Sequence, residues 1–428
     1  MNPRHTTLVS TFLYHAPKAN AFPPHRFRNG TDNSRIGALA LILLSTAIST
    51  PAQSWIKTDL PALAWSSVAV SADGTKLVAL AQDNSAGAVY ISADSGATWS
   101  PTSAPPGRWT SVAWSADGNR IAIAANGEPN GPVYLSSDAG VTWTTANLPE
   151  SSWTSIASSA DGRRLVVVSY SYPDGPIHTS QDFGETWTKA AILPSGWTSV
   201  ASSADGLRLV VVSNSFPDGP AYTSTDGGIT WVPTSLPPSS WMSVASSADG
   251  LRLTAISNAY PDGPVYTSTD GGQTWNKRSA TPDNYSAIAS SADGQRLVAA
   301  TAVNNGQRGQ IYVSNNGGTA WTTTDAPARV WKGVASSADG RLHIAAAEWD
   351  GIYIRRTPAP SILSLTRLST GSVQLAIRGA PNDRVTVWAS STLETWSQIG
   401  VASRISEGTY RYVDTAAVGQ ASRFYLTK

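Results

Sequence analysis

The stretch WTSVASSADGLRL, residues Trp197 to Leu209, recurs with small changes along most of this 428-residue chain. Its copies are 44 residues apart five times in succession and then 46, and they begin at Trp65, Trp109, Trp153, Trp197, Trp241, Tyr285 and Trp331. A period of about 40 to 50 residues with short strands and turn signals is typical of β-propellers, in which each repeat forms one four-stranded sheet. The spacing therefore predicts an all-β, seven-bladed propeller.

Four strands are expected in each repeat. In the fourth copy, residues 197–202 alternate between apolar and polar, a tight turn follows at 204–206, and 207–213 are rich in valine. The breaker run at 217–220 separates the second strand from a third at 221–224. In such a sheet, the loop between the second and third strands lies on the same face as the connection to the next blade.

A second motif, SxDxGxTW, stands between the third and fourth strands and resembles the Asp-box, also called the BNR repeat. It occurs at Ser92 to Trp99, Ser136 to Trp143, Ser180 to Trp187, Ser224 to Trp231 and Ser268 to Trp275. We interpret it as structural, because Asp accepts N–H bonds across its own turn, Gly allows positive φ and Trp fills the gap between sheets. The residues expected in this role are Asp94, Trp99, Asp138, Trp143, Asp182, Trp187, Asp226, Trp231, Asp270 and Trp275. A sixth copy has Asn316 and Ala320 in place of Asp and Thr, which puts its hydrogen bonding in doubt.

The seventh repeat ends at Arg356, one strand short. The segment Ser54 to Pro61 matches the residues that come after each box, and Trp55 stands where a box tryptophan would stand. We therefore expect an N-terminal strand to complete the seventh blade, so that no blade edge is left unpaired. A closed ring of this kind is expected to be a monomer.

Both ends of the chain lie outside the period. An apolar run from Ile36 to Ile48 behind Arg35 is typical of a signal peptide, and it is too short for a comfortable membrane span; an uncleaved anchor is the alternative. We expect bacterial export to the periplasm, cell surface or medium, with no transmembrane span after signal removal. Residues 358–428 alternate as strands, which fits a small β-sandwich. The predicted domains are a signal peptide at 1–52, the propeller at 53–357 and the sandwich at 358–428.

The segments Val387 to Trp396 and Arg423 to Leu426 resemble a C-terminal module of secreted bacterial proteins. Composition limits the partners of the whole chain. Charged residues are 14% of the chain and the net charge is +1, which argues against nucleic acid and anionic membranes. The chain has no cysteine, so disulfides and thiolate metal sites are excluded, and we expect neither a cofactor nor a metal.

The loops between second and third strands carry an aromatic residue and a carboxylate in three consecutive blades. They read YPDGP at 172–176, FPDGP at 216–220 and YPDGP at 260–264. Aromatic rings with acceptor carboxylates suit carbohydrate hydroxyls, whereas the alternative is that the prolines only stiffen long turns. The candidate ligand-binding residues are Tyr172, Asp174, Phe216, Asp218, Tyr260 and Asp262, with the neighbouring Trp153, Trp197 and Trp241. Packing between blades is the alternative role for these tryptophans.

Asp-box propellers resemble sialidases and certain xyloglucan hydrolases, and the repeats also resemble photosystem II assembly factors. A sialidase would need three arginines that converge on one substrate. Here Arg120, Arg164, Arg208, Arg252 and Arg296 occupy one equivalent position per blade, and symmetric placement cannot converge. The xyloglucan enzymes use two propellers and the assembly factors a basic patch, and neither is visible here. We therefore predict no catalytic residue and a binding module for glycan or protein; the alternative is an exo-acting glycoside hydrolase of the sialidase kind.

Overall fold

The computed structural model describes residues 54–427 except 83–86, 128–130, 172–174, 193–194, 216–218, 260–262, 279–283, 303–307, 380–384, 392–394, 396, 407 and 419–422. The chain divides into two compact units, one over Gln53–Thr357 and one that includes Pro358–Lys428. The predicted signal peptide lies outside the described residues. Across the described parts, no helix is long and apolar enough to cross a membrane.

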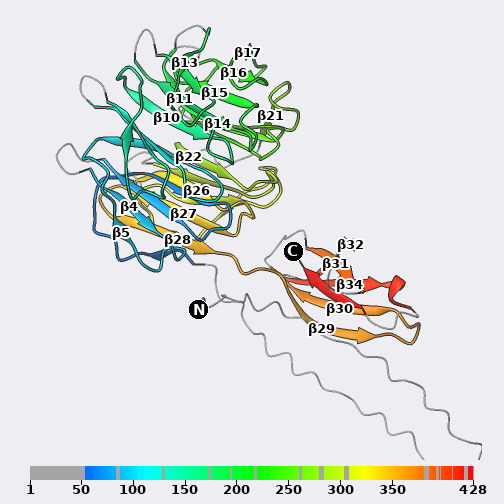
Figure 1. Cartoon of the computed structure of the whole chain (residues 1–428). Helices are drawn as coiled ribbons and strands as arrows, with labels where there is room; N and C mark the ends of the chain where they lie inside the picture. Colours follow the sequence, from blue (N-terminus) through cyan, green and yellow to red (C-terminus); the bar gives the residue numbers. More distant parts are fainter. Residues whose placement is uncertain are drawn as a thin grey trace, which may run out of the picture. The chain divides into compact units, whose positions relative to one another are not determined.

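The larger unit consists of seven four-stranded antiparallel sheets, here called blades 1 to 7 in chain order (Figure 1). Blade 1 contains β2 (Trp65–Val70), β3 (Leu77–Ala81), β4 (Val89–Ser92) and β5 (Ser100–Pro101). Blade 2 contains β6 (Trp109–Trp114), β7 (Ile121–Ala125), β8 (Val133–Ser136) and β9 (Thr144–Thr145). Blade 3 contains β10 (Trp153–Ser158), β11 (Leu165–Ser169), β12 (Ile177–Ser180) and β13 (Thr188–Lys189).

The remaining blades follow the same order. Blade 4 contains β14 (Trp197–Ser202), β15 (Leu209–Ser213), β16 (Ala221–Ser224) and β17 (Val232–Pro233). Blade 5 contains β18 (Trp241–Ser246), β19 (Leu253–Ser257), β20 (Val265–Ser268) and β21 (Asn276–Arg278). Blade 6 contains β22 (Tyr285–Ser290), β23 (Leu297–Thr301), β24 (Ile311–Ser314) and β25 (Thr322–Thr323). Blade 7 combines β26 (Trp331–Ser336), β27 (Leu342–Ala347) and β28 (Gly351–Arg356) with β1 (Ile56–Lys57).

The two ends of the propeller sequence meet in blade 7. Strand β1 pairs antiparallel with β28, with Ile56 opposite Ile354. The Trp55 side chain is buried, its indole N–H donates to Thr324 Oγ1 at 2.9 Å, and its ring centroid lies 6.4 Å from that of Trp331. The first strands of blades 1 and 7 are also neighbours, which closes the ring. The predicted closure by an N-terminal strand is confirmed.

The second strand of each blade forms the centre of the core. All of its residues are buried in every blade, because each sheet is covered on both faces by its neighbours. A strand in this position is mostly apolar, which accounts for runs such as LVVVS at 165–169 and 209–213. The first strands instead mix buried and half-buried residues, because they are the innermost strands of the ring.

The repeated arginines have a structural role at the blade boundaries. A Cβ built on Gly206, which has φ of +71°, would lie 2.6 Å from Arg164 Cδ of the preceding blade. A Cβ on Gly250 would be 2.6 Å from Arg208 Cβ in the same way. The glycine is therefore needed both for its backbone conformation and for the approach of the arginine stem. These arginines are used in packing between blades and do not converge on one site.

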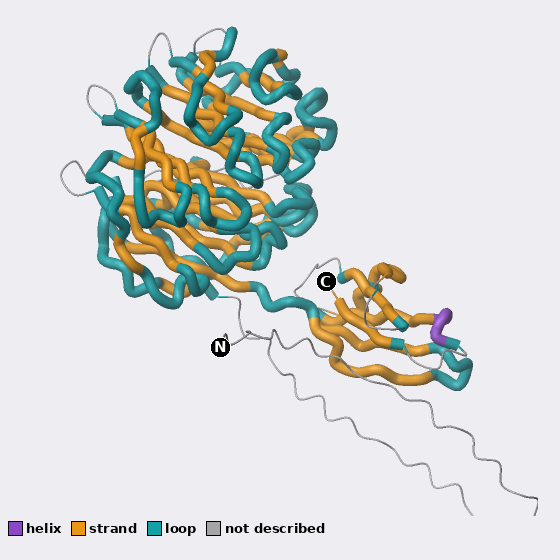
Figure 2. Tube along the Cα trace, viewed as in Figure 1, coloured by secondary structure: helices purple, strands orange, loops and turns teal. Residues whose placement is uncertain are grey.

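The smaller unit contains two antiparallel sheets. One has the order β29 (Ser361–Arg367), β30 (Val373–Arg378), β34 (Thr409–Asp414) and β33 (Ser403–Ser406). The other has the order β32 (Ser397–Val401), β31 (Thr386–Ser390) and β35 (Phe424–Thr427), and a short 3-10 helix, η1 (Thr415–Ala417), follows β34 (Figure 2). Leu375, Tyr410, Val387 and Tyr425, which come from both sheets, belong to one hydrophobic cluster. We propose that this unit is the small β-sandwich that the alternation predicts.

Candidate functional site

The propeller has two faces with different connections. The loops between second and third strands meet the connections between blades on one face, which we call the connection face. A Cβ on Gly175 would lie 2.2 Å from Ser195 O, and one on Gly219 would lie 2.3 Å from Ser239 O. The Asp-boxes lie on the opposite face, which we call the box face, where for example the Gly227 N–H donates to Leu207 O at 2.9 Å.

The predicted loop residues Tyr172, Asp174, Phe216, Asp218, Tyr260 and Asp262 lie outside the described residues. The frame that carries two of these loops is described. Ser151 Oγ lies 2.7 Å from Ser169 Oγ and 3.0 Å from Ser171 Oγ, and Ser195, Ser213 and Ser215 repeat this arrangement one blade later. These hydroxyl clusters join each blade connection to the base of the loop beside it. They hold the bases of these two loops in place.

The tryptophans that begin the blades are not ligand platforms. Trp153, Trp197 and Trp241 have no exposed surface. Each packs edge-on against an aromatic ring of the third strand of its own blade, with centroid distances of 5.7 Å to His178, 6.0 Å to Tyr222 and 5.8 Å to Tyr266. The prediction that these three tryptophans contact a ligand was therefore wrong, since a buried ring cannot stack on a sugar.

An aromatic residue outside the predicted set lies on the connection face of blade 7. Trp349 is 66% exposed and stands in the turn between β27 and β28. Its φ is +56°, and its N–H donates to Leu63 O in the connection to blade 1 at 2.8 Å. Bulky residues rarely adopt this left-handed conformation, and such strain is found mainly at functional sites.

The residue after Trp349 fixes this turn. Asp350 accepts hydrogen bonds from Lys57 Nζ at 2.7 Å, Arg329 Nε at 2.5 Å and the Tyr353 hydroxyl at 2.8 Å. Burial raises the pKa of Asp350, but the hydrogen bonds from Lys57, Tyr353 and Arg329 outweigh burial and hold the pKa at about 2. The carboxylate therefore stays charged at physiological pH and ties β1, the blade connection and β28 together at this turn.

The innermost strand of blade 7 also departs from the repeat. Lys332 Nζ lies 3.1 Å from Glu348 Oε2, next to Trp349. The other blades have small or uncharged residues at the Lys332 position, namely Ser66, Thr110, Thr154, Thr198, Met242 and Ser286. Blade 7 therefore places an exposed tryptophan and an ion pair together on the connection face.

In the Asp-boxes, the aspartate is hydrogen-bonded to residues of its own turn. Asp270 accepts hydrogen bonds from the Thr274 hydroxyl at 2.5 Å and the Ser268 hydroxyl at 2.7 Å, and the bonds from Thr274 are the main reason that its pKa is lowered to about 2. The half-buried Trp275 donates its indole N–H to Gly272 O at 3.1 Å. In the sixth box, Asn316 still accepts from Ser314 and from the Ala320 N–H, so this turn keeps its shape and loses only the threonine bond. Over the described part of the chain, no group of three or more His, Asp or Glu residues could hold a metal.

Comparison with known proteins supports the fold. The family model of the BNR/Asp-box repeat matches residues 222–233 and 266–277. This chain carries BNR repeats. A GH74 xyloglucanase from Xanthomonas campestris has 18% identity and a TM-score of 0.56, and the match covers 76% of this chain and 59% of that one. At this identity the likeness shows the fold alone, and the present chain spans only 59% of the xyloglucanase.

Two other solved structures are similar to the propeller at comparable levels. The structure of YCF48 bound to D1 peptide has 16% identity and a TM-score of 0.53, with 72% of this chain and 99% of that chain covered. Hydrazine synthase from Kuenenia stuttgartiensis has 16% identity and a TM-score of 0.54, with 71% and 97% covered. A search among curated protein sequences found no match. Together with the repeated four-stranded sheets, these likenesses confirm the predicted all-β propeller.

Proposed function

We propose that this protein is an exported, non-catalytic binding module that recognises a glycan on the connection face of its propeller. The observation that carries this proposal is Trp349, whose side chain is 66% exposed and whose φ is positive. The turn that presents this ring is held by the neighbouring Asp350, which accepts hydrogen bonds from Lys57, Arg329 and Tyr353. An aromatic ring offers an apolar face to the C–H side of a sugar. The neighbouring ion pair of Lys332 and Glu348 offers donors and acceptors for its hydroxyls.

A catalytic role has less support. The arginines that a sialidase-like hydrolase would use pack between blades. The box carboxylates accept hydrogen bonds from Ser and Thr residues of their own turns, as Asp270 does. A hydrolase of the sialidase kind is therefore the weaker candidate. A peptide ligand is the second candidate for the same face, because the propeller of YCF48, which is described as bound to a peptide, matches over 99% of its length.

Replacing Trp349 by Ala should weaken ligand binding by about 30-fold or more, which corresponds to the loss of about 2 kcal/mol expected for a central aromatic contact. Binding would be measured on a glycan array and a peptide array, followed by calorimetry with the best ligand. Ile229→Ala is the matched control, since Ile229 is also 66% exposed but lies in an Asp-box on the other face. Equal affinity of the Trp349→Ala variant and the parent protein would contradict the proposal.

Replacing Tyr172, Phe216 and Tyr260 together by Ala should abolish binding and leave the melting temperature unchanged, because serine hydroxyls hold the described bases of the first two loops. Retained affinity would remove the three loops from the binding face. Hydrolysis of a fluorogenic sialoside would be followed in parallel. Turnover that is lost when acids on the connection face are changed would refute a purely binding role.

A further inference from the structure

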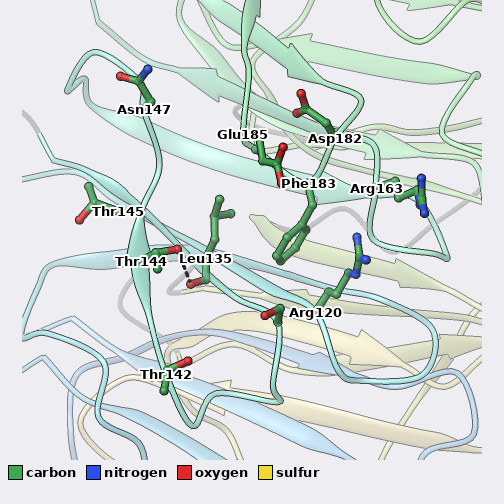
Figure 3. Close-up of a pocket in the computed structure, with 12 residues that line it drawn as sticks. Arg120, Leu135, Thr142, Thr144, Thr145, Asn147, Arg163, Asp182, Phe183 and Glu185 are labelled. Carbon is green, nitrogen blue, oxygen red and sulfur yellow. Dashed lines mark hydrogen bonds between the residues drawn. The ribbon is translucent and has the colours of Figure 1, made fainter.

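A groove of about 630 Å³ lies between blades 2 and 3 on the box face, away from the connection face. Its walls come from the outer strands of blade 2 and from the Asp-box of blade 3, and they include Leu135, Thr145, Asn147, Phe183 and Glu185 (Figure 3). Binding sites for small molecules have volumes of about 300 to 1,000 Å³. The groove is therefore large enough for one or two sugar units, and nothing in the proposed function uses it.

The groove lies where the third Asp-box departs from the repeat. Phe183 has φ of +60°. The equivalent residues in the other boxes are Ser95, Ala139, Gly227, Gly271 and Gly317, all of them small. A phenylalanine is unfavourable at positive φ, and three of the six boxes have glycine at this position. Because the turn itself does not need a ring, its presence points to a contact outside the turn.

Surrounding groups hold the Phe183 ring against the groove. The Phe183 N–H donates to Arg163 O at 2.7 Å, and the guanidinium carbon of Arg120 lies 4.9 Å from the ring centroid. Figure 3 shows the ring between Arg120 and Leu135, and Phe183 belongs to the same hydrophobic cluster as Leu135. In blade 4, a Cβ on Gly227 would lie 3.0 Å from Nη1 of the equivalent Arg164. The ring of Phe183 thus packs on an arginine that occurs at the same position in blades 2 to 6, whether or not an aromatic residue follows in the next box.

Three of the polar side chains that line the groove make no hydrogen bond within the described part of the fold. Thr145, Asn147 and Glu185 are exposed, and none of these side chains forms a hydrogen bond with another described residue. Together they offer a hydroxyl, an amide and a carboxylate next to an aromatic ring. Arg120 and Arg163 balance Asp182 and Glu185, so the groove has no excess charge to attract an anion or a cation.

We propose that this groove is a second ligand site that takes a neutral saccharide. A sugar hydroxyl both donates and accepts, so it is matched by a mixture of carboxylate, amide, hydroxyl and guanidinium groups rather than by one kind of charge. The apolar side of the sugar ring would lie against Phe183. Because the groove and the connection face are on opposite sides of the propeller, the molecule could hold two glycan segments at once, and this site stands independently of the one at Trp349.

The test is Phe183→Gly, which gives the third box the residue that three other boxes have and so should fold like the parent protein. Binding would be measured by calorimetry of the full chain with hexasaccharides of β-linked glucose, xylose, mannose and N-acetylglucosamine, and with a hexagalacturonate as the anionic probe. We expect a neutral hexasaccharide to bind and Phe183→Gly to weaken it at least tenfold. Ser95→Gly, the matched change in blade 1, should leave the affinity unchanged.

Two further variants separate the sites and guard against a folding artefact. Asn147→Ala changes an exposed residue of the groove and should also weaken binding, whereas Trp349→Ala should leave binding in the groove intact. The proposal is overturned if none of the neutral hexasaccharides binds the parent protein, if hexagalacturonate binds more tightly than all of them, or if Phe183→Gly binds as well as the parent. Loss of all binding in Trp349→Ala alone would overturn the groove and support only the connection face.

Discussion

Removal of residues 53–61 should produce aggregated or strand-swapped species in place of the monomer that we expect for the closed ring. Without β1, the edge of β28 loses its partner, and the buried face around Trp331 loses the covering indole of Trp55. An unpaired edge strand with apolar neighbours pairs readily with another chain. Size-exclusion chromatography with light scattering would show the change in mass. A deletion variant that remains a monomer with unchanged melting would contradict closure by β1.

Two point variants isolate the cause within this strand. Trp55→Ala should lower the free energy of unfolding by about 3 to 5 kcal/mol, as expected for the loss of a buried tryptophan. The neighbouring Ile56 is 63% exposed, so Ile56→Ala should change the free energy of unfolding by no more than about 0.5 kcal/mol. Denaturant titration of both variants measures this difference. Equal effects would show that the strand contributes only its backbone pairing.

Acid should destabilise the propeller well above the pH at which carboxylates titrate, because of His343. This residue is 3% exposed in β27, and neither of its ring nitrogens has a hydrogen-bond partner of good geometry among the described residues. Burial, together with the charges of Arg355 and Arg296, lowers the pKa of His343 from 6.5 to about 3. Between about pH 6.5 and pH 3, His343 is therefore protonated in the unfolded chain but neutral in the folded chain. The free energy of unfolding then falls by about 1.4 kcal/mol for each unit by which the pH drops in this range.

The control for this prediction is His343→Val. Other blades have leucine or isoleucine at this place, among them Leu165, Leu209 and Leu297, so the variant replaces the imidazole by an apolar side chain as in the other repeats. Denaturant titrations between pH 7 and 4.5 should show a smaller loss of stability for His343→Val than for the parent protein. Burial also lowers the pKa of His178, which accounts for a remaining slope, whereas the box aspartates with pKa near 2, such as Asp270, contribute only below about pH 4. Parallel pH profiles for the two proteins would refute the role of His343.

Sequence periodicity was sufficient for the blades and for their closure. It could not decide the role of the tryptophans that begin them, because each first strand has a register shift directly after the tryptophan, as between Trp153 and Ser155. Such an irregularity changes which face a side chain occupies, so alternation alone does not tell a buried ring from an exposed one. The prediction that these rings bind ligand failed at this point.

The two aromatic residues of the proposed sites could not be found from the features that the repeats share. Their signal lies in the places where the repeats differ. Phe183 replaces a small residue in an otherwise regular box, and Trp349 follows the second strand of a blade whose loop has lost the proline motif. Neither substitution by itself shows whether the side chain is buried. Exposure, the positive φ of both residues and the groove beside Phe183 come from the structure.

A ring of repeated sheets closed by an N-terminal strand can be predicted from the amino-acid sequence, because strand periodicity and spacing are local properties that every repeat carries. Tertiary structure decided which aromatic rings are covered. Burial depends on the side chains that the next blade brings against a ring, and those lie about 44 residues away in the sequence. For the same reason, Trp197 is in the core while Trp349 faces solvent.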